Sequence, residues 1–445
     1  MHPTRSGRLL FIAHEFPPSA GGGVQRLTKF ARYLGEMGWD IQVLSATPVP
    51  GRPRDETLLG EVDGIRVFRR PARHIAGYIA GVLRPLKRMK AVVPGAAAAG
   101  ASSGTPGAAE GRGPLSGRIS RWLAVPDDAV LWARDIPVVA ARMHREAPFA
   151  AIVASGPPYS ALVGAVRAGE RLQVPVIADL RDPWSGNLHA VWPTTWHQRR
   201  FHALEREVME RVAGVTAVSE VIAAEAIAYG AKRAEVIPNG FDAADMPAWS
   251  PDTSAPLRIA FLGQFSPGVA DPAGFFAGVA AARGSEPLLA DLRIDVVGPA
   301  APWAVESAHR VGLGDAVVFH GFKPYAEALR VIAAADAGLI VLADSPGSKG
   351  VYSGKLFDYV GIGIPILLYG PPEGAAADVV RATGCGAVVR YGDLAQVEAA
   401  VIALAREKAS GGVQCQSSQA VRATYDRREQ VRVLSRMIED VITAR

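Results

Sequence analysis

The stretch YSGKLFDYVGIGIPILLYG, residues 352–370, predicts a short helix followed by a buried strand. Ser353 can cap the helix, and the spacing of Lys355 and Asp358 places both side chains on one helix face. Glycines then stop the helix, and the apolar run PILLYG is typical of a central strand in a parallel sheet. A cation near a helix N-terminus is unfavourable unless an anion lies there as well. The stretch therefore indicates an anion-binding helix start.

The same alternation of strands and helices extends in both directions along the chain. A strand, a glycine-rich turn, a helix and a second strand follow one another in GRLLFIAHEFPPSAGGGVQRLTKFARYLGEMGWDIQVLSA, which predicts a βαβ unit and hence a parallel sheet. Further strands are expected at IRVFRR, AAIVASG, VPVIADL, VTAVSE, AEVIPNG, LRIAFLG, LRIDVVG, AVVFHGF, AGLIVLA and GAVVRYG. We expect an α/β protein with two tandem Rossmann-like, doubly wound parallel-sheet domains that face a cleft.

Composition shifts predict the domain boundaries. Residues 1–245 form the expected N-terminal domain, and within it the Gly/Ala/Ser-rich residues 93–118 are expected to be a flexible insertion. A Pro/Asp/Ser-rich linker is expected at 246–256, and a second Rossmann-like domain at 257–419. Residues 420–445 read as one amphipathic helix that packs back across the domains.

The bulk composition narrows the function classes. A chain of 445 residues favours two domains, and two cysteines cannot build a disulfide framework or a four-ligand zinc site, which favours a reducing, cytoplasmic location. The N-terminal apolar run is too short for a signal peptide. A net charge of +5 is mild, and no nucleic-acid-binding motif is present, so a nucleic-acid partner is not expected.

One basic, partly apolar segment remains open to two interpretations. Residues 74–90 join an apolar stretch to four basic residues, and such a segment can lie on an anionic membrane surface. Packing as an ordinary surface helix on its own domain explains the pattern equally well.

Two further positions carry candidate site residues at strand ends, where ligands bind in open parallel sheets. Glycines 21–23 open the first helix, where backbone can approach a ligand closely, although the pattern is not that of a nicotinamide dinucleotide site. The stretch VIADLRDPWSGN, residues 176–187, ends a strand in charged groups beside Trp184, which suits a polar substrate such as a sugar.

In this order and at these spacings, the motifs resemble glycosyltransferases of the two-Rossmann-domain (GT-B) type. The resemblance is to the retaining group called family four, or glycosyl transferases group 1, and it covers almost the whole chain. It rests on EFPPSAGGGVQRLTKFARYLGEMGWDIQVLS, VTAVSE, VIPNGFD, RIAFLGQF, VVFHGFKPYAEALRVIAAADAGLIVL and GKLFDYVGIGIPIL. The anion at the helix start is then the diphosphate of a nucleotide-sugar. The resemblance also implies that residues 1–245 are the acceptor-side domain and that residues 257–419 are the nucleotide-sugar-binding domain.

The resemblance implies roles for individual residues. Lys355 corresponds to a phosphate-binding lysine, Asp358 to a ribose-binding glutamate, and the backbone near Phe322 and Lys323 to the base site. Donor-binding positions are Gly21, Gly22, Gly23, Gln264, Phe322, Lys323, Ser353, Gly354, Lys355 and Asp358. Acceptor-side positions are His14, Glu15, Arg181, Asp182 and Trp184. Asp182, which would orient the acceptor hydroxyl, and Lys355 are the catalytic candidates.

The chain also departs from the family pattern at the donor and acceptor sides. Asp358 is one methylene shorter than the usual glutamate, and Gly350 stands where the family has a second glutamate. Gln264 replaces a frequent phosphate-binding arginine, and Arg181 stands where many members have a histidine. Donor binding should therefore depend on Lys355.

The expected function is transfer of a sugar, with retained anomeric configuration, from a nucleotide-diphosphate sugar to a hydroxyl acceptor that could be lipid-linked. Polysaccharide or glycolipid biosynthesis at the inner face of a membrane is the expected setting. No metal ion and no cofactor are expected, because lysine and helix N–H groups can stabilise the departing phosphate. Two alternatives stay open: a nucleotide-sugar 2-epimerase on the same architecture, and a non-catalytic nucleotide-sugar binder.

Overall fold

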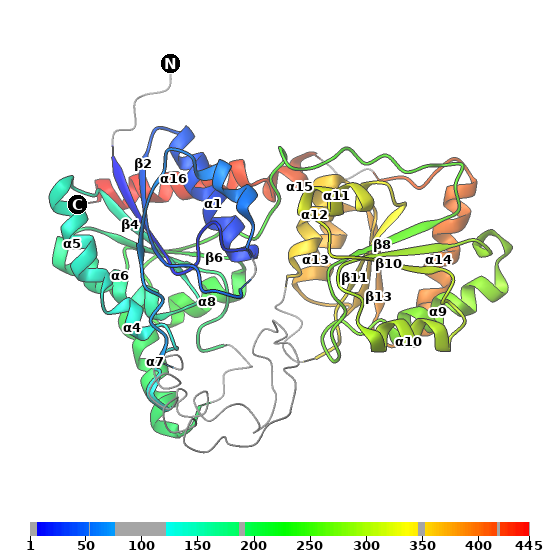
Figure 1. The fold of residues 1–445 in the computed structure, drawn as a ribbon, viewed down its shortest axis with the longest axis horizontal. Helices are drawn as coiled ribbons and strands as arrows, with labels where there is room; N and C mark the ends of the chain where they lie inside the picture. The colour runs from blue at the N-terminus through cyan, green and yellow to red at the C-terminus, as the bar shows by residue number, and fades with distance from the viewer. Residues whose placement is uncertain are drawn as a thin grey trace, which may run out of the picture. The chain divides into compact units, whose positions relative to one another are not determined.

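A computed structural model describes residues 7–52, 54–75, 122–186, 192–345, 352–415 and 419–444. The chain divides into two compact units. Unit 1 is Met1–Pro238 together with Val431–Arg445, and unit 2 is Asn239–Gln430. Each unit is a parallel sheet covered by helices on both faces (Figure 1). This confirms the prediction of two tandem Rossmann-like α/β domains, and every strand expected from the sequence is present.

In the described part of unit 1, seven parallel strands lie in the spatial order β3-β2-β1-β4-β5-β6-β7. The strands are β1 (Arg8–Ala13), β2 (Asp40–Ala46), β3 (Arg66–Arg70), β4 (Ala151–Gly156), β5 (Val176–Leu180), β6 (Gly214–Ala217) and β7 (Ala234–Val236). The helical elements are α1 (Gly22–Glu36), η1 (Glu56–Val62), α4 (Val130–Ala133), α5 (Ile136–Glu146), α6 (Ser160–Leu172), α7 (Thr195–Met209), α8 (Glu220–Ala228) and most of α16 (Arg427–Thr443).

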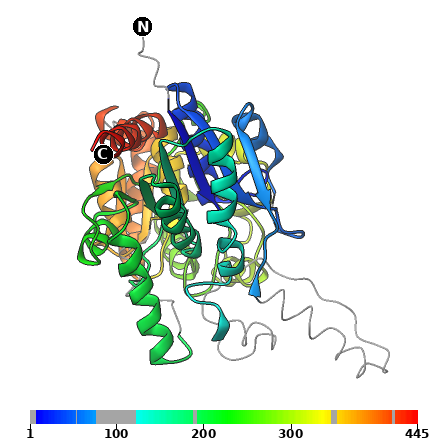
Figure 2. The same cartoon turned by 90° about the vertical axis from the view of Figure 1, so that its left-hand side faces the viewer.

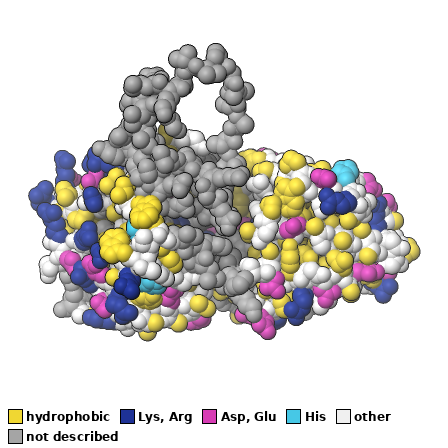
Figure 3. Space-filling view, turned by 90° about the horizontal axis from the view of Figure 1, so that it is seen from below, with side chains coloured by type: hydrophobic (Ala, Val, Ile, Leu, Met, Phe, Trp, Pro, Cys, Tyr) yellow, Lys and Arg dark blue, Asp and Glu magenta, His cyan; other side chains and the backbone are white. Residues whose placement is uncertain are grey.

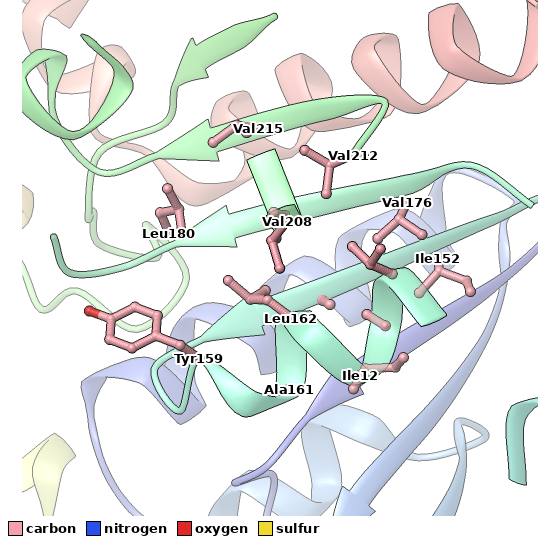
Figure 4. Packing of buried hydrophobic residues seen from close by; sticks show 14 of the residues in the cluster. Ile12, Ile152, Tyr159, Ala161, Leu162, Val176, Leu180, Val208, Val212 and Val215 are labelled. Carbon is pink, nitrogen blue, oxygen red and sulfur yellow. The ribbon is translucent and has the colours of Figure 1, made fainter. Parts of the chain in front are cut away.

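The central strands of unit 1 bury side chains on both faces of the sheet. Leu10 and Ile12 of β1 point into one hydrophobic cluster, and Leu9 and Phe11 point into another, as the two-residue period of a strand requires. Figure 4 shows part of the first cluster, in which valines of α7 and β6 pack against residues of β4 and α6. The apolar residues of α16 complete the second cluster. The C-terminal helix therefore belongs to the core of unit 1.

In the described part of unit 2, six parallel strands lie in the order β10-β9-β8-β11-β12-β13. The strands are β8 (Arg258–Leu262), β9 (Arg293–Val297), β10 (Val317–Gly321), β11 (Ala337–Val341), β12 (Ile366–Gly370) and β13 (Gly386–Arg390). The helical elements are α9 (Ala273–Ser285), η2 (Pro287–Leu289), α10 (Pro302–Arg310), α11 (Tyr325–Ala333), α12 (Gly354–Ile362), α13 (Ala375–Thr383), α14 (Leu394–Ala409) and α15 (Gln419–Thr424).

The structure differs from the expected single helix over residues 420–445. The chain forms two helices, α15 and α16, with a break between them. At the break, the Phe241 N–H donates to the Tyr425 carbonyl at 3.0 Å, and the Arg427 N–H donates to the Phe241 carbonyl at 2.9 Å. The backbone at the break bonds to a segment about 185 residues earlier, so it cannot complete the intrahelical bonds.

The polar stretch 246–256, expected to be a linker, packs as part of unit 2. The Trp249 indole N–H donates to the Ala335 carbonyl at 2.9 Å, and the Ser250 N–H donates to the Ala333 carbonyl at 2.9 Å. These bonds fix the stretch beside the end of α11. The boundary between the units accordingly falls earlier, after Pro238.

The two cysteines, Cys385 and Cys415, form a disulfide within unit 2. Disulfides persist mainly in oxidising compartments, so cysteine content does not support the reducing location drawn from the sequence. Over the described residues, no helix is both long and apolar enough to cross a membrane. The insertion at 93–118 lies outside the described residues, and of 74–90 only His74 and Ile75 are described.

Candidate functional site

In unit 2 the site is built where α12 begins. The Tyr359 hydroxyl accepts a hydrogen bond from the Leu262 N–H at 2.9 Å and donates to the Leu339 carbonyl at 3.3 Å. These two bonds hold α12 against the carboxyl ends of β8 and β11. Ser353 occupies the N-cap position with extended backbone, but its hydroxyl makes no capping hydrogen bond, contrary to expectation. The first N–H groups of α12 therefore donate no hydrogen bond to the Ser353 side chain.

Lys355 lies over the end of β8. Its Nζ is 3.8 Å from the centre of the Phe261 ring, and a Cβ built on Gly263 would lie 3.1 Å from that Nζ. Among the described residues, Lys355 has no carboxylate or hydrogen-bond partner. Burial lowers the pKa of Lys355 to about 7. An ammonium held over an aromatic ring without a counter-ion is suited to bind an anion.

Asp358, one turn further along α12, is bonded to a residue that the sequence analysis did not identify. The Tyr325 hydroxyl, at the start of α11, donates to its Oδ1 at 2.7 Å. Burial raises the pKa of Asp358 to about 6, although the Tyr325 hydrogen bond and the Arg427 guanidinium act in the opposite direction. The bond engages Oδ1 and orients the carboxylate.

The remaining expected donor residues lie at neighbouring strand ends. Gln264 follows β8 and is exposed, and Gly354 is exposed at the first position of α12. Phe322 follows the edge strand β10 with 84% of its surface exposed, and Lys323 beside it is partly buried. Strands two places apart in a sheet are separated by about 10 Å. The exposed Phe322 ring therefore follows a strand about 10 Å from β8, over whose end the Lys355 amine lies. Gly350 lies outside the described residues.

In unit 1 the glycines at the start of α1 leave space for an arginine. Gly21 adopts a φ of 139° at the N-cap, a backbone conformation that favours glycine, and Gly22 starts the helix. A Cβ built on Gly23 would lie only 1.4 Å from the Arg181 guanidinium. Arg181 also donates to the Pro157 carbonyl. The glycine run thus allows a cation to rest on the first turn of α1.

Asp179, at the end of β5, is a structural residue. Its carboxylate accepts hydrogen bonds from Arg26 at 2.9 Å, Ser155 at 2.8 Å and Thr216 at 2.8 Å, and neither partner of the ion pair is exposed. Burial alone would raise the pKa of Asp179, but Arg26 and the two hydroxyls lower it overall. The network ties α1 to three strands and so fixes the strand ends that carry Arg181 and Asp182.

Asp182 and Trp184 occupy different environments. Asp182 is exposed, and its carbonyl accepts a hydrogen bond from the Tyr159 hydroxyl at 3.4 Å. Trp184 is completely buried and stacks on the Tyr159 ring with centres 4.5 Å apart. The structure therefore leaves Asp182 accessible to a substrate and places Trp184 in the core.

His14 and Glu15 line a cavity of about 110 Å³ at the ends of β1 and β2. The buried His14 ring meets the Trp132 ring edge-on at 5.0 Å. Burial, with the nearby His74 and Arg52, lowers the pKa of His14 to about 4, so the imidazole is neutral near pH 7. Glu15 forms an ion pair with Arg52 at 2.8 Å. The cavity thus offers both hydrogen-bond donors and hydrogen-bond acceptors to a polar substrate.

Sequence reasoning also missed two carboxylates beside the turn after β5, one buried and one half-buried. Glu205 of α7 is 1% exposed, and burial, with the nearby Glu225, raises its pKa to about 7. Glu225 accepts a hydrogen bond from the Gly186 N–H at 2.6 Å. No motif marks either residue, because both come from helices distant in sequence. Within the described ranges, no cluster of three or more His, Cys, Asp or Glu could hold a metal ion.

Two Rossmann-like units, each a parallel sheet with helices on both faces, make up the fold of GT-B glycosyltransferases, and this chain has that fold. Residues 21–240 match the family model described as "Glycosyl transferase 4-like domain", and this part of the chain belongs to that family. The match begins at the glycine run of α1. No curated protein sequence matches the chain.

Solved structures share the fold over nearly the whole length. The sucrose-phosphate synthase of Thermosynechococcus elongatus has 12% identity and a TM-score of 0.64, with 99% of this chain and 100% of that chain covered. Anabaena Alr3699/HepE, solved in complex with UDP and glucose, has 14% identity and a TM-score of 0.62, with 98% and 100% covered. A putative UDP-N-acetylglucosamine 2-epimerase from Listeria monocytogenes has 9% identity and a TM-score of 0.55, with 98% and 97% covered.

Proposed function

We propose that the protein is a retaining, metal-independent glycosyltransferase that moves a sugar from a nucleotide-diphosphate sugar to a hydroxyl acceptor. The observation that supports this proposal is that the Lys355 amine lies over the end of β8 and has no counter-ion among the described residues. A diphosphate would supply the missing anion, and the first N–H groups of α12 would assist. The UDP and glucose bound to HepE are consistent with this class of donor.

Other residues of the unit 2 site can bind the nucleoside part of the donor. The Asp358 carboxylate, oriented by Tyr325, can accept hydrogen bonds from the ribose hydroxyls. The exposed Phe322 ring offers a stacking surface for the base. With the nucleoside and diphosphate held this way, the sugar lies beyond the strand ends of unit 2.

Chemistry then requires negative charge to be stabilised as the diphosphate departs from an oxocarbenium-like sugar. Protonated Lys355 supplies the fixed positive charge at the departing phosphate, which is our reason for proposing a metal-independent reaction. In the retaining pathway the acceptor hydroxyl attacks from the face that the leaving group vacates, and the departing phosphate takes the hydroxyl proton. Exposed Asp182 orients that hydroxyl, and neutral His14 contributes a hydrogen bond on the acceptor side.

The acceptor and location extend this proposal. A cytoplasmic enzyme at the inner face of a membrane, acting in polysaccharide or glycolipid biosynthesis on a lipid-linked acceptor, fits the basic segment 74–90. The disulfide does not support the cytoplasmic part of that proposal.

A thermal-shift screen against UDP-, GDP-, dTDP- and ADP-sugars tests the donor site. A ligand that binds only the folded state raises its melting temperature. We expect a shift with one nucleotide class that is lost in Lys355→Ala and Asp358→Ala. No shift with any of the four at millimolar concentration would contradict the proposal. Epimerised donor in the absence of any acceptor would favour the 2-epimerase instead.

A further inference from the structure

Unit 1 carries a further cluster of basic side chains, which the sequence analysis did not identify. A cavity of about 200 Å³ lies between α4, α6 and α7. Its lining includes three arginines, Arg134, Arg167 and Arg200, and apolar residues such as Val130 and Leu204. No carboxylate side chain lines it. Each arginine comes from a different part of the chain, so the fold brings the three charges together.

These guanidinium groups are poorly neutralised. Within the described residues, Arg134 and Arg167 form no ion pair or side-chain hydrogen bond, and both are exposed. The nearest carboxylate of Arg200 is Glu207, at 3.9 Å, and the Arg200 side chain keeps 43% of its surface exposed. Three like charges around one cavity raise the local positive potential and favour an anionic ligand.

Large exposed apolar side chains occur within four residues, along the chain, of residues that line this cavity. Trp122, Leu123 and Trp196 are 56%, 61% and 62% exposed. The two indoles meet the same buried ring: the His197 centre is 5.4 Å from Trp122 and 5.0 Å from Trp196. Trp196 lies one helical turn before Arg200 on α7, so the two share a face.

In Figure 2 the green helix α7 extends beyond the strand ends of unit 1. Figure 3 shows hydrophobic, basic and acidic side chains side by side on the described surface of unit 1. Exposed tryptophans beside arginines are typical of surfaces that enter the headgroup region of a bilayer, because the indole is apolar with one polar edge.

We propose that this surface, formed by Arg134, Arg167, Arg200, Trp122 and Trp196, docks on anionic phospholipid, with a lipid phosphate seated among the three arginines. A free phosphate metabolite would need the arginines but would leave both exposed tryptophans without a partner. A bilayer uses both features, which is why we choose the lipid source. None of these five residues belongs to 74–90, and the proposal does not depend on the donor site.

The test is flotation of the full chain with vesicles of phosphatidylcholine, alone or with an equal part of phosphatidylglycerol. Each arginine near an anionic surface contributes about fivefold in partition, so the triple substitution R134Q/R167Q/R200Q should lose about 100-fold at low salt. The matched control R310Q/R330Q/R390Q removes the same charge from exposed positions in unit 2 and should lose less than fivefold.

A second variant separates the apolar contribution from the electrostatic one. Trp196→Ser should lower binding to anionic vesicles while leaving its salt dependence unchanged, because no charge is removed. Melting temperatures show whether each variant is folded, and the donor thermal shift of the arginine variant should equal that of the parent.

Three results would overturn the proposal. The parent chain could fail to bind anionic vesicles, or the two triple variants could bind equally well. Alternatively, inorganic phosphate could raise the melting temperature of the parent but not of R134Q/R167Q/R200Q, with no vesicle binding. That last result would assign the cavity to a small phosphate ligand.

Discussion

Replacement of Lys355 by methionine removes the charge at the proposed diphosphate site while keeping the length of the side chain. In the structure the amine lies 3.8 Å from the Phe261 ring centre and has no counter-ion among the described residues. A hydrogen bond to a charged group contributes about 1.5–3 kcal/mol net. At 1.4 kcal/mol per factor of ten, Lys355→Met should weaken donor binding by about 10- to 150-fold.

The pKa of Lys355 determines how donor affinity should change with pH. Because burial lowers the pKa of Lys355 to about 7, the free enzyme carries the ammonium below pH 7 and the neutral amine above it. Donor affinity should therefore fall by up to about tenfold per pH unit above pH 7, whereas an ordinary lysine would keep its charge to about pH 10. Isothermal titration with the donor between pH 6 and pH 9 measures this slope, and Lys355→Met should show no such slope.

The stability of the donor-free protein should rise with pH, whereas donor affinity should fall. The folded pKa of Lys355 lies below that of the unfolded chain, so the unfolded chain binds more protons between about pH 7 and pH 10 and stability rises with pH there. Lys355→Met should stabilise the donor-free protein most at or below pH 7. The matched control is Lys232→Met, at an exposed lysine of unit 1. Equal donor affinity for Lys355→Met and Lys232→Met at pH 6 would refute the reasoning.

Three further substitutions test the supporting structure. Arg26→Met leaves the Asp179 carboxylate buried without its ion-pair partner and should cost about 3–5 kcal/mol in chemical denaturation, and a loss below 1 kcal/mol would contradict this account. Cys385→Ser opens a disulfide with a sequence separation of 30 and should lower stability by about 3.5 kcal/mol, whereas an unchanged denaturation midpoint would mean that the bond is absent in solution. Tyr325→Phe removes the hydrogen bond that lowers the pKa of Asp358, so the pH below which donor affinity falls should move upward from about pH 6. An unchanged pH profile would mean that Tyr325 does not control the protonation of Asp358.

The fold was accessible from the sequence because its signals are local. Apolar runs of strand length alternate with helical periods, and the structure has a strand at each predicted position. What local patterns could not reveal are contacts between distant segments. The break before α16 arises from backbone bonds to Phe241, and the segment 246–256 is fixed by bonds to α11 that its polar composition conceals.

The site was accessible only in part for the same reason. Lys355 and Asp358 share one helix face, so their spacing indicates a common ligand. Their partners Phe261 and Tyr325 come from other elements, 94 and 33 residues away along the chain, and carry no motif of their own. Trp184 illustrates the converse case, because an aromatic residue beside charged groups is buried in the core.

Sugar transfer itself is the most direct test of the proposed function. The donor that raises the melting temperature should be incubated with the protein and candidate hydroxyl acceptors, including lipid-linked ones, and the products followed by mass spectrometry and anomeric NMR. We predict one nucleoside diphosphate released for each sugar joined to acceptor, with the donor's anomeric configuration retained and the rate reduced in Lys355→Met. Inverted configuration, or donor converted to an epimer with no acceptor present, would contradict the account.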